Sequence, residues 1–179
     1  MSIDYELIKK NIFEKGFHEF YEPEGVDIIN ADQFRLMNTE ERSRDNGIKD
    51  VSQELAQRLT LVSQVFKDKY IDPIWPGAVY NKFIIWEGVD NDNRGWHTDM
   101  FEGYDVFFLY YLDDTFPESG GGIQFKWKED DAFKEITVQP KKGTLVMVNN
   151  CRGFWHRAVA STIRRRVASF DFNAGLEDD

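Results

Sequence analysis

The sequence predicts an α+β fold, in which helices from the first part of the chain pack on one face of a β-sandwich or barrel formed by the rest. Two observations lead to this prediction. Apolar residues in the first part recur at the three- and four-residue spacings of a helix, whereas those after residue 77 fall into short runs divided by turn residues. The length of 179 residues suits one domain. We therefore expect a single domain over residues 1–179, with helices and a loop in 1–77 and the β core in 78–173.

The first 77 residues should contain two helices, a strand and a loop. Residues 4–14 favour a short helix, and residues 16–21 alternate apolar and polar side chains, as a half-buried strand does. Residues 31–50 are polar with little periodicity, which predicts a long loop. A second helix begins at Ser52 and ends before Pro73. Its apolar stripe consists of Leu55, Leu59, Val62 and Phe66.

Short apolar runs make up the remainder of the chain. They are residues 78–86, 105–112, 122–127, 134–139, 143–149, 154–160 and 164–172. Turn residues separate most of them, including Asp113–Asp114, Gly120–Gly122 and Pro140–Gly143. Seven or eight short strands with tight turns are typical of a sandwich or barrel.

Composition excludes several classes of function. The chain carries 22 Lys and Arg against 32 Asp and Glu, a net charge of −10 that disfavours nucleic-acid partners, because they require clustered basic residues. No apolar run approaches the roughly 18 residues of a membrane span. The N-terminal segment MSIDYELIKK lacks the apolar core of a signal peptide. Cys151 is the only cysteine, so no internal disulfide can form. We expect a cytoplasmic protein without membrane partners.

A candidate metal site comes from the histidines. His97 and Asp99 are two residues apart, so in a strand both side chains project from one face. His156 lies in a later aromatic run, FWHRAVA. Two histidines and one carboxylate can form a facial triad that suits Fe(II) and leaves coordination positions open. An H-x-D pattern alone also occurs by chance, with the histidine an ordinary surface or core residue.

The surroundings of these residues point to a family. The H-T-D of 97–99 is followed in order by DVFFLYYLDD, SGGGIQF, ITVQPKKG, WHRAVAS and RRRVASFDF. This order and spacing resembles the Fe(II)/2-oxoglutarate-dependent dioxygenases, most closely their prolyl 4-hydroxylase-like branch, over roughly residues 78–173. The resemblance implies a double-stranded β-helix, which is a jelly-roll or cupin-like barrel, with the N-terminal helices packed on its major sheet.

The resemblance also implies roles for individual residues. His97, Asp99 and His156 would be the catalytic Fe(II) ligands, and 2-oxoglutarate would chelate the metal. The hydroxyl of Tyr111 would help to hold the distal carboxylate of 2-oxoglutarate, the alternative being that Tyr111 is a core aromatic residue of its strand. By alternation Tyr110 points to the opposite face and should be a core residue. Gly121 and Gly122 fit the glycine turn of the family.

An arginine should bind the same distal carboxylate, since a guanidinium can donate two parallel hydrogen bonds to it. Arg164, Arg165 and Arg166 are eight, nine and ten residues after His156. Both the nine- and ten-residue spacings occur in the family, so Arg165 and Arg166 are nearly even candidates. We slightly prefer Arg165, because Ala168, Phe170 and Phe172 then remain on the face that packs against the helices. At least one of the three arginines should belong to a solvated basic edge.

Several features bear on the substrate more weakly. Trp86 stands where relatives often have a pocket tyrosine, which favours a different primary substrate. The loop 31–50 is either a lid or an ordinary exposed loop. Six acidic residues lie between Glu87 and Asp105, and they either favour a neutral or basic substrate or form a solvated face. Trp96 and Trp155 each precede a ligand histidine and should face away from the metal. His18 is expected to be structural.

The resemblance implies an enzyme that uses Fe(II), 2-oxoglutarate and dioxygen, with ascorbate as a supporting reductant. It would hydroxylate an unactivated C–H bond and release succinate and CO2. The first substrate hypothesis is a prolyl residue in a peptide or protein, and the alternative is a free amino acid or small metabolite. The segment RRRVASFDFN lacks the R-x-N-x-T-x-R pattern of nucleic-acid demethylases. A hypothesis from another class is a non-catalytic barrel for binding or scaffolding, although the complete set of site residues argues against it.

Overall fold

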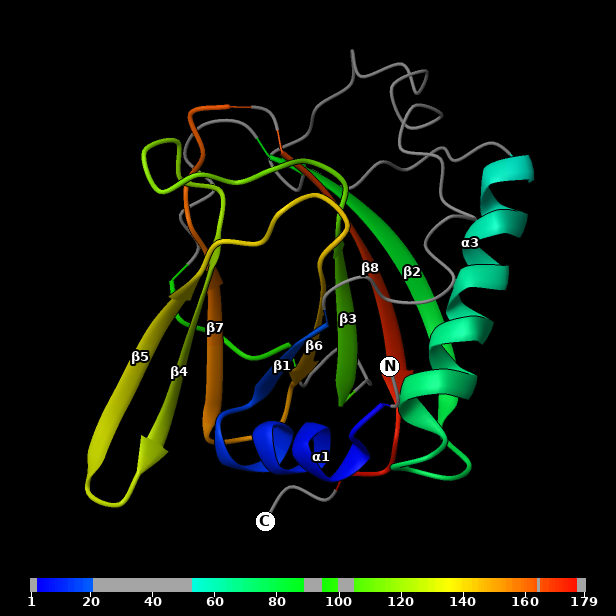
Figure 1. Cartoon of the computed structure of the whole chain (residues 1–179), viewed down its shortest axis with the longest axis horizontal. Helices are drawn as coiled ribbons and strands as arrows, with labels where there is room; N and C mark the ends of the chain where they lie inside the picture. Colours follow the sequence, from blue (N-terminus) through cyan, green and yellow to red (C-terminus); the bar gives the residue numbers. More distant parts are fainter. Residues whose placement is uncertain (1–2, 21–52, 89–94, 100–104, 164, 177–179) are drawn as a thin grey trace.

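A computed structural model describes residues 3–20, 53–88, 95–99, 105–163 and 165–176 (Figure 1). The first helix, α1 (Tyr5–Glu14), leads into strand β1 (Phe17–Phe20). The second described helix, α3 (Gln53–Phe66), continues into a π-helical turn, η2 (Lys67–Ile71). The later strands are β2 (Val79–Gly88), β3 (Val106–Tyr111), β4 (Ile123–Glu129), β5 (Ala132–Val138), β6 (Leu145–Asn149), β7 (Phe154–Ala158) and β8 (Arg165–Asn173).

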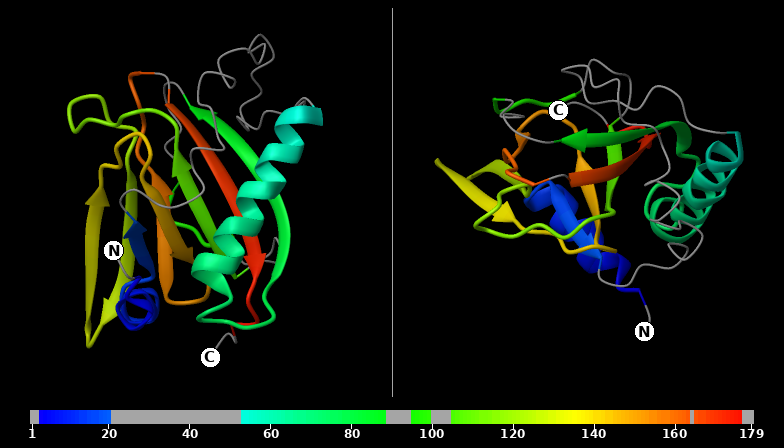
Figure 2. Two further views of the ribbon diagram at one scale, coloured as in Figure 1. Left: turned by 45° about the vertical axis from the view of Figure 1, so that its right-hand side comes forward. Right: turned by 90° about the horizontal axis from the view of Figure 1, so that it is seen from above.

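These strands form two antiparallel sheets. The larger sheet has the order β1-β6-β3-β8-β2, and the smaller has the order β5-β4-β7. The two sheets lie on opposite sides of the β unit, and α3 covers the outside of the larger one (Figures 1 and 2). This arrangement confirms the predicted double-stranded β-helix with helices on its major sheet. The seven apolar runs after residue 77 all become strands, whereas the predicted loop 31–50 lies outside the described residues.

An apolar core fills the space between the sheets. Phe17 of β1 stacks on Phe125 of β4, with ring centroids 4.2 Å apart and planes only 5° from parallel. Buried valines of the larger sheet belong to the same core. They are Val146, Val148 and Val167. The contact between Phe17 and Phe125 ties the first strand of the chain to the smaller sheet, so the N-terminal segment helps to fix the spacing of the two sheets.

A second core joins the helices to the outer face of the larger sheet. The helical stripe predicted from the sequence is confirmed for Leu59, Val62 and Phe66, each fully buried, while the Leu55 side chain lies outside the described residues. The Phe66 ring lies 5.4 Å from that of Phe108 and 5.2 Å from that of Phe170. The α-helix ends at Phe66 and η2 carries the chain on to Ile71, so the helical backbone extends almost to Pro73.

Alternation along β8 decides which of its side chains face the interior. Ala168, Phe170 and Phe172 belong to the outer core beneath α3, as the sequence predicts. Val167 belongs to the inner core and pairs with Tyr111 of β3. Neighbouring residues on a strand point to opposite faces, so Arg165 lies on the inner face and Arg166 on the outer face.

No helix in the described part of the chain is long and apolar enough to cross a membrane.

Candidate active site

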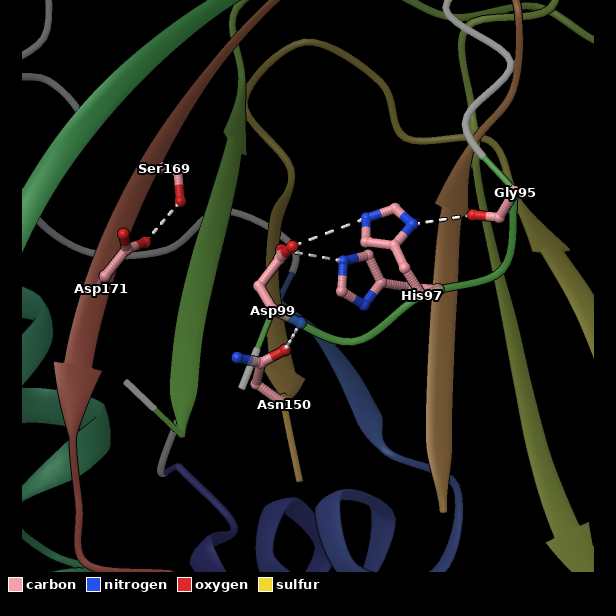
Figure 3. Close-up of polar contacts among 7 residues, drawn as sticks. Gly95, His97, Asp99, Asn150, Ser169 and Asp171 are labelled. Atoms are coloured by element: carbon pink, nitrogen blue, oxygen red, sulfur yellow. Dashed lines mark hydrogen bonds and ion pairs between the residues drawn. The ribbon is translucent and has the colours of Figure 1, made fainter. Parts of the chain in front are cut away.

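The three predicted metal ligands come together at one edge of the smaller sheet. His156 is in the middle of β7, and His97 pairs with it in antiparallel fashion. The His97 N–H donates to the His156 carbonyl at 3.1 Å, and the His156 N–H donates to the His97 carbonyl at 3.0 Å. Directly paired residues of antiparallel strands point to the same face, so both imidazoles project into the barrel. Asp99 follows two residues later, and its carboxylate oxygens face Nε2 of both rings (Figure 3).

The ligand atoms of these residues are close enough to hold one ion. An Asp99 carboxylate oxygen lies 3.3 Å from His156 Nε2, and the other lies 3.8 Å from His97 Nε2. One ligand atom from each residue lies within 4.8 Å of the others. Two imidazole nitrogens and one carboxylate oxygen are the donor set of a 2-His-1-carboxylate Fe(II) site. The residues therefore fit the metal that the sequence implies.

A hydrogen bond can orient the His97 ring, and burial favours the neutral form of His156. His97 Nδ1 lies 2.7 Å from the Gly95 carbonyl oxygen. If Nδ1 carries the proton and donates to that carbonyl, the lone pair of Nε2 is directed toward Asp99. Burial lowers the pKa of His156 below its usual value of 6.5, with His97 adding to this effect and Asp99 opposing it. A lowered pKa keeps the His156 ring neutral at pH 7.

Arg165, the preferred candidate for binding 2-oxoglutarate, lies on the inner face of β8. Its Nη1 donates to the Gly121 carbonyl at 2.8 Å and contacts the Gly122 carbonyl at 3.3 Å. Its Nε is buried and has no hydrogen-bond partner among the described residues. Tyr111 lies beside it, 1% exposed. Burial raises the pKa of Tyr111 to about 12 although the Arg165 cation opposes the shift, so the phenol remains a hydrogen-bond donor at pH 7.

The two candidate arginines have different surroundings. Arg166 lies on the outer face, where its Nε and Nη2 reach the two Asp113 carboxylate oxygens at 2.8 and 2.6 Å. The Arg166 backbone N–H also donates to Asp113, at 2.9 Å. Asp113 therefore occupies the fork of Arg166, whereas Arg165 directs its guanidinium toward Tyr111. Arg164 lies outside the described residues.

The tryptophans next to His97 and His156 lie on the outer face of the smaller sheet. The Arg157 guanidinium lies 4.4 Å from the Trp96 ring centroid, and Trp155 makes an edge contact with Phe133. Both indoles thus face away from the histidines, as alternation predicts. The Trp86 side chain, expected near the pocket, is outside the described residues. His18 contacts Asn11 at 2.9 Å, as a structural residue would.

One contact at the site was not anticipated from the sequence. The Asp99 backbone N–H donates to Asn150 Oδ1 at 2.7 Å. These residues are 51 positions apart, and no motif in the chain marks Asn150. Only the tertiary structure identifies this pair.

A comparison with known protein families identifies the family of the β core. The family model described as "2OG-Fe(II) oxygenase superfamily" matches residues 83–172, which is half of the chain. The matched range includes the three candidate metal ligands, Arg165 and Tyr111. No curated protein matches the chain.

Solved structures share the fold at low sequence identity. A prolyl hydroxylase from Trichoplax adhaerens, in complex with a peptide fragment of the hypoxia-inducible-factor oxygen degradation domain, is 12% identical, with a TM-score of 0.66 over 95% of this chain and 89% of that one. A prolyl 4-hydroxylase from Pseudomonas putida is 14% identical, with a TM-score of 0.59 over 97% of this chain and 100% of that one. An α-ketoglutarate-dependent epimerase of nogalamycin biosynthesis is 12% identical, with a TM-score of 0.67 over 94% of this chain and 82% of that one.

Proposed function

The chain belongs to the 2OG-Fe(II) oxygenase superfamily, and we propose that it hydroxylates an unactivated C–H bond, with a prolyl residue of a peptide or protein as its first candidate substrate. The observation that carries this proposal is the convergence of two imidazoles and a carboxylate on one point inside the barrel. The cofactors of the family are Fe(II), 2-oxoglutarate and dioxygen.

His97, Asp99 and His156 would hold the metal. Two neutral nitrogens and one carboxylate occupy half of an octahedral coordination sphere and leave the rest for 2-oxoglutarate and dioxygen. Iron bound there would supply the chemistry by which dioxygen oxidises 2-oxoglutarate to succinate and CO2 and the substrate to its hydroxylated product. The protein contributes ligands fixed by the pairing of His97 with β7 and by the Asn150 contact to Asp99.

Arg165 and Tyr111 would hold the distal carboxylate of 2-oxoglutarate. An arginine guanidinium has two edges with paired N–H donors, Nε with Nη2 and Nη1 with Nη2, and the glycine carbonyls engage Nη1 of Arg165. The edge formed by Nε and Nη2 is the one that would bind a carboxylate with two parallel bonds. The Tyr111 hydroxyl, kept protonated by burial, would add a third donor. Arg166 is a weaker candidate, since Asp113 already engages both of its fork nitrogens.

The proposed substrate rests only on the activities of proteins with a similar structure. Two of the similar structures are prolyl hydroxylases, and one of them contains a bound peptide. Another is an epimerase, so this fold supports more than one reaction. A proline-containing peptide is therefore the first substrate to test, followed by free proline.

The test is conversion of 2-oxoglutarate to succinate with Fe(II) and ascorbate, alone and with proline-containing peptides. His97→Ala serves as the control without a complete metal site. We expect succinate from the wild-type protein, stimulated by the right peptide and absent in the variant. Stimulation by free proline but by no peptide would replace the peptide hypothesis with a small-molecule one. Failure of the wild-type protein to bind either Fe(II) or 2-oxoglutarate without oxygen would favour a non-catalytic barrel.

A further inference from the structure

We propose that Asn150 is a positioning residue of the metal site, whose side-chain amide holds the Asp99 backbone so that the Asp99 carboxylate meets the two imidazoles. The inference rests on the proposed metal site. It adds a residue that neither the H-x-D pattern nor the family match assigns, and it makes a prediction about metal affinity that can be tested without turnover.

Asp99 needs an anchor that differs from that of His97. Backbone hydrogen bonds in both directions hold His97 against His156, which fixes it to the smaller sheet. That pairing stops at His97, and the chain then turns toward the interior. At Asp99 the backbone N–H donates instead to Asn150 Oδ1, at 2.7 Å (Figure 3). The Asn150 side chain thus fixes the backbone at Asp99, as pairing with β7 fixes the backbone at His97.

Asn150 itself is fixed to the larger sheet. It directly follows β6 and is 0% exposed. Its backbone N–H donates to the Asp105 carbonyl at 2.8 Å, and the Asp105 N–H donates to the Phe172 carbonyl of β8 at 3.2 Å. The histidine ligands therefore depend on the smaller sheet, while the carboxylate ligand is tied to the larger one. The metal triad spans both sheets, and the Asn150 amide is the link on the Asp99 side.

The chemistry of this contact specifies the residue type. Because the partner is a backbone N–H, the side chain must present an acceptor, and this sets the orientation of the Asn150 amide. Alanine would remove the acceptor and leave a part-buried N–H of the ligand segment without its bond. Aspartate has nearly the same shape and could accept the same bond. Residues that orient metal ligands typically change metal affinity by about 10–100-fold when they are removed.

The adjacent residue offers a matched control. Asn149 is also buried, at 2% exposed, and its side chain bonds to the Ile12 carbonyl and to the Cys151 N–H. None of these contacts involves the residues 95–99. Asn149→Ala should therefore lower stability while leaving metal affinity unchanged, which separates general destabilisation from loss of positioning.

The experiment measures the dissociation constant of Mn(II) for metal-free protein, by the electron paramagnetic resonance signal of the free ion. Each variant is measured well below its own unfolding temperature, with its fold checked by circular dichroism. We expect Asn150→Ala to weaken Mn(II) binding by about 10–100-fold. Asn150→Asp should restore most of the affinity, and Asn149→Ala should match the wild type. If Asn150→Ala does not fold, Asn150→Ser replaces it, because the shorter side chain cannot reach the Asp99 N–H.

The possible results separate the positioning role of Asn150 from the metal site itself. Equal affinity in the wild type and the folded Asn150→Ala variant would overturn the positioning role while leaving the metal site intact. Equal losses in the Asn149 and Asn150 variants would also overturn it, since they would indicate a general effect of destabilisation. Absence of Mn(II) binding by the wild type would instead refute the metal site on which the inference rests.

Discussion

The neighbouring arginines of β8 provide a sharp test, because the same conservative change should have different consequences at each. Arg165→Lys and Arg166→Lys both keep the positive charge and remove the planar fork of the guanidinium. Arg165 directs its fork into the barrel beside Tyr111, whereas Arg166 directs its fork at Asp113 on the outer face. We expect Arg165→Lys to weaken 2-oxoglutarate binding and Arg166→Lys to lower stability.

The magnitudes follow from the bonds that each fork makes. At position 165, a lysine can replace a bidentate contact with a single one, and losing one charged hydrogen bond costs about 1.5–3 kcal/mol. That loss corresponds to a dissociation constant for 2-oxoglutarate about 10- to 150-fold higher. At position 166 the lost bond is to Asp113, whose side chain is 25% exposed and so partly regains water. We expect a stability loss of about 2 kcal/mol, or about 4–8 °C in Tm for a domain of this size.

The assay is calorimetric titration of 2-oxoglutarate into Mn(II)-loaded protein, with thermal unfolding of each metal-free variant beside it. Arg165→Lys should show the affinity loss together with a fall in Tm, because its bonds to the Gly121 and Gly122 carbonyls are lost as well. Arg166→Lys should lower Tm and leave the affinity for 2-oxoglutarate unchanged. Weaker 2-oxoglutarate binding in Arg166→Lys but not in Arg165→Lys would refute the assignment. Unchanged affinity in both variants would place the distal carboxylate elsewhere.

Three further predictions concern the surroundings of the site. Gly121 has φ +80°, and an added Cβ would lie 3.3 Å from Arg165 Cδ. Gly121→Ala should therefore lower the free energy of unfolding by about 1 kcal/mol or more and weaken 2-oxoglutarate binding. Unchanged affinity for 2-oxoglutarate would count against this placement of Arg165. Burial lowers the pKa of His18 in the folded protein, so the unfolded chain takes up more protons as the pH drops below 6.5. The free energy of unfolding should therefore fall as the pH drops from 6.5 toward the folded pKa. His18→Gln should make this fall shallower in urea titrations, and an equally steep fall would contradict the prediction. The Arg157–Trp96 contact should show a coupling of about 0.5–1 kcal/mol in a double-mutant cycle of alanine variants, and additive effects would show that the contact contributes nothing.

Local patterns in the sequence predicted most of the architecture. The spacing of Leu59, Val62 and Phe66 fixes one helical face, and all three are fully buried. Alternation along β8 placed Phe170 and Phe172 against the helices. These predictions worked because side-chain direction in a helix or strand follows directly from residue number.

Contacts between distant segments could not be predicted in this way. Nothing local indicates that Asn150 bonds to Asp99, or that Asp113 rather than a ligand engages Arg166. The spacing after His156 left Arg165 and Arg166 nearly equal. Alternation along β8 favours Arg165, and the register of β8 against β3, which pairs Val167 with Tyr111, places Arg165 on the same face as that tyrosine.

Iron binding can be measured directly by anaerobic equilibrium dialysis of the metal-free protein against Fe(II), for the wild type and for His97→Ala, both with folding confirmed. We expect saturable, stoichiometric Fe(II) binding by the wild type and a large loss of affinity in the variant. Undiminished Fe(II) binding by folded His97→Ala would show that His97, Asp99 and His156 do not form the iron site.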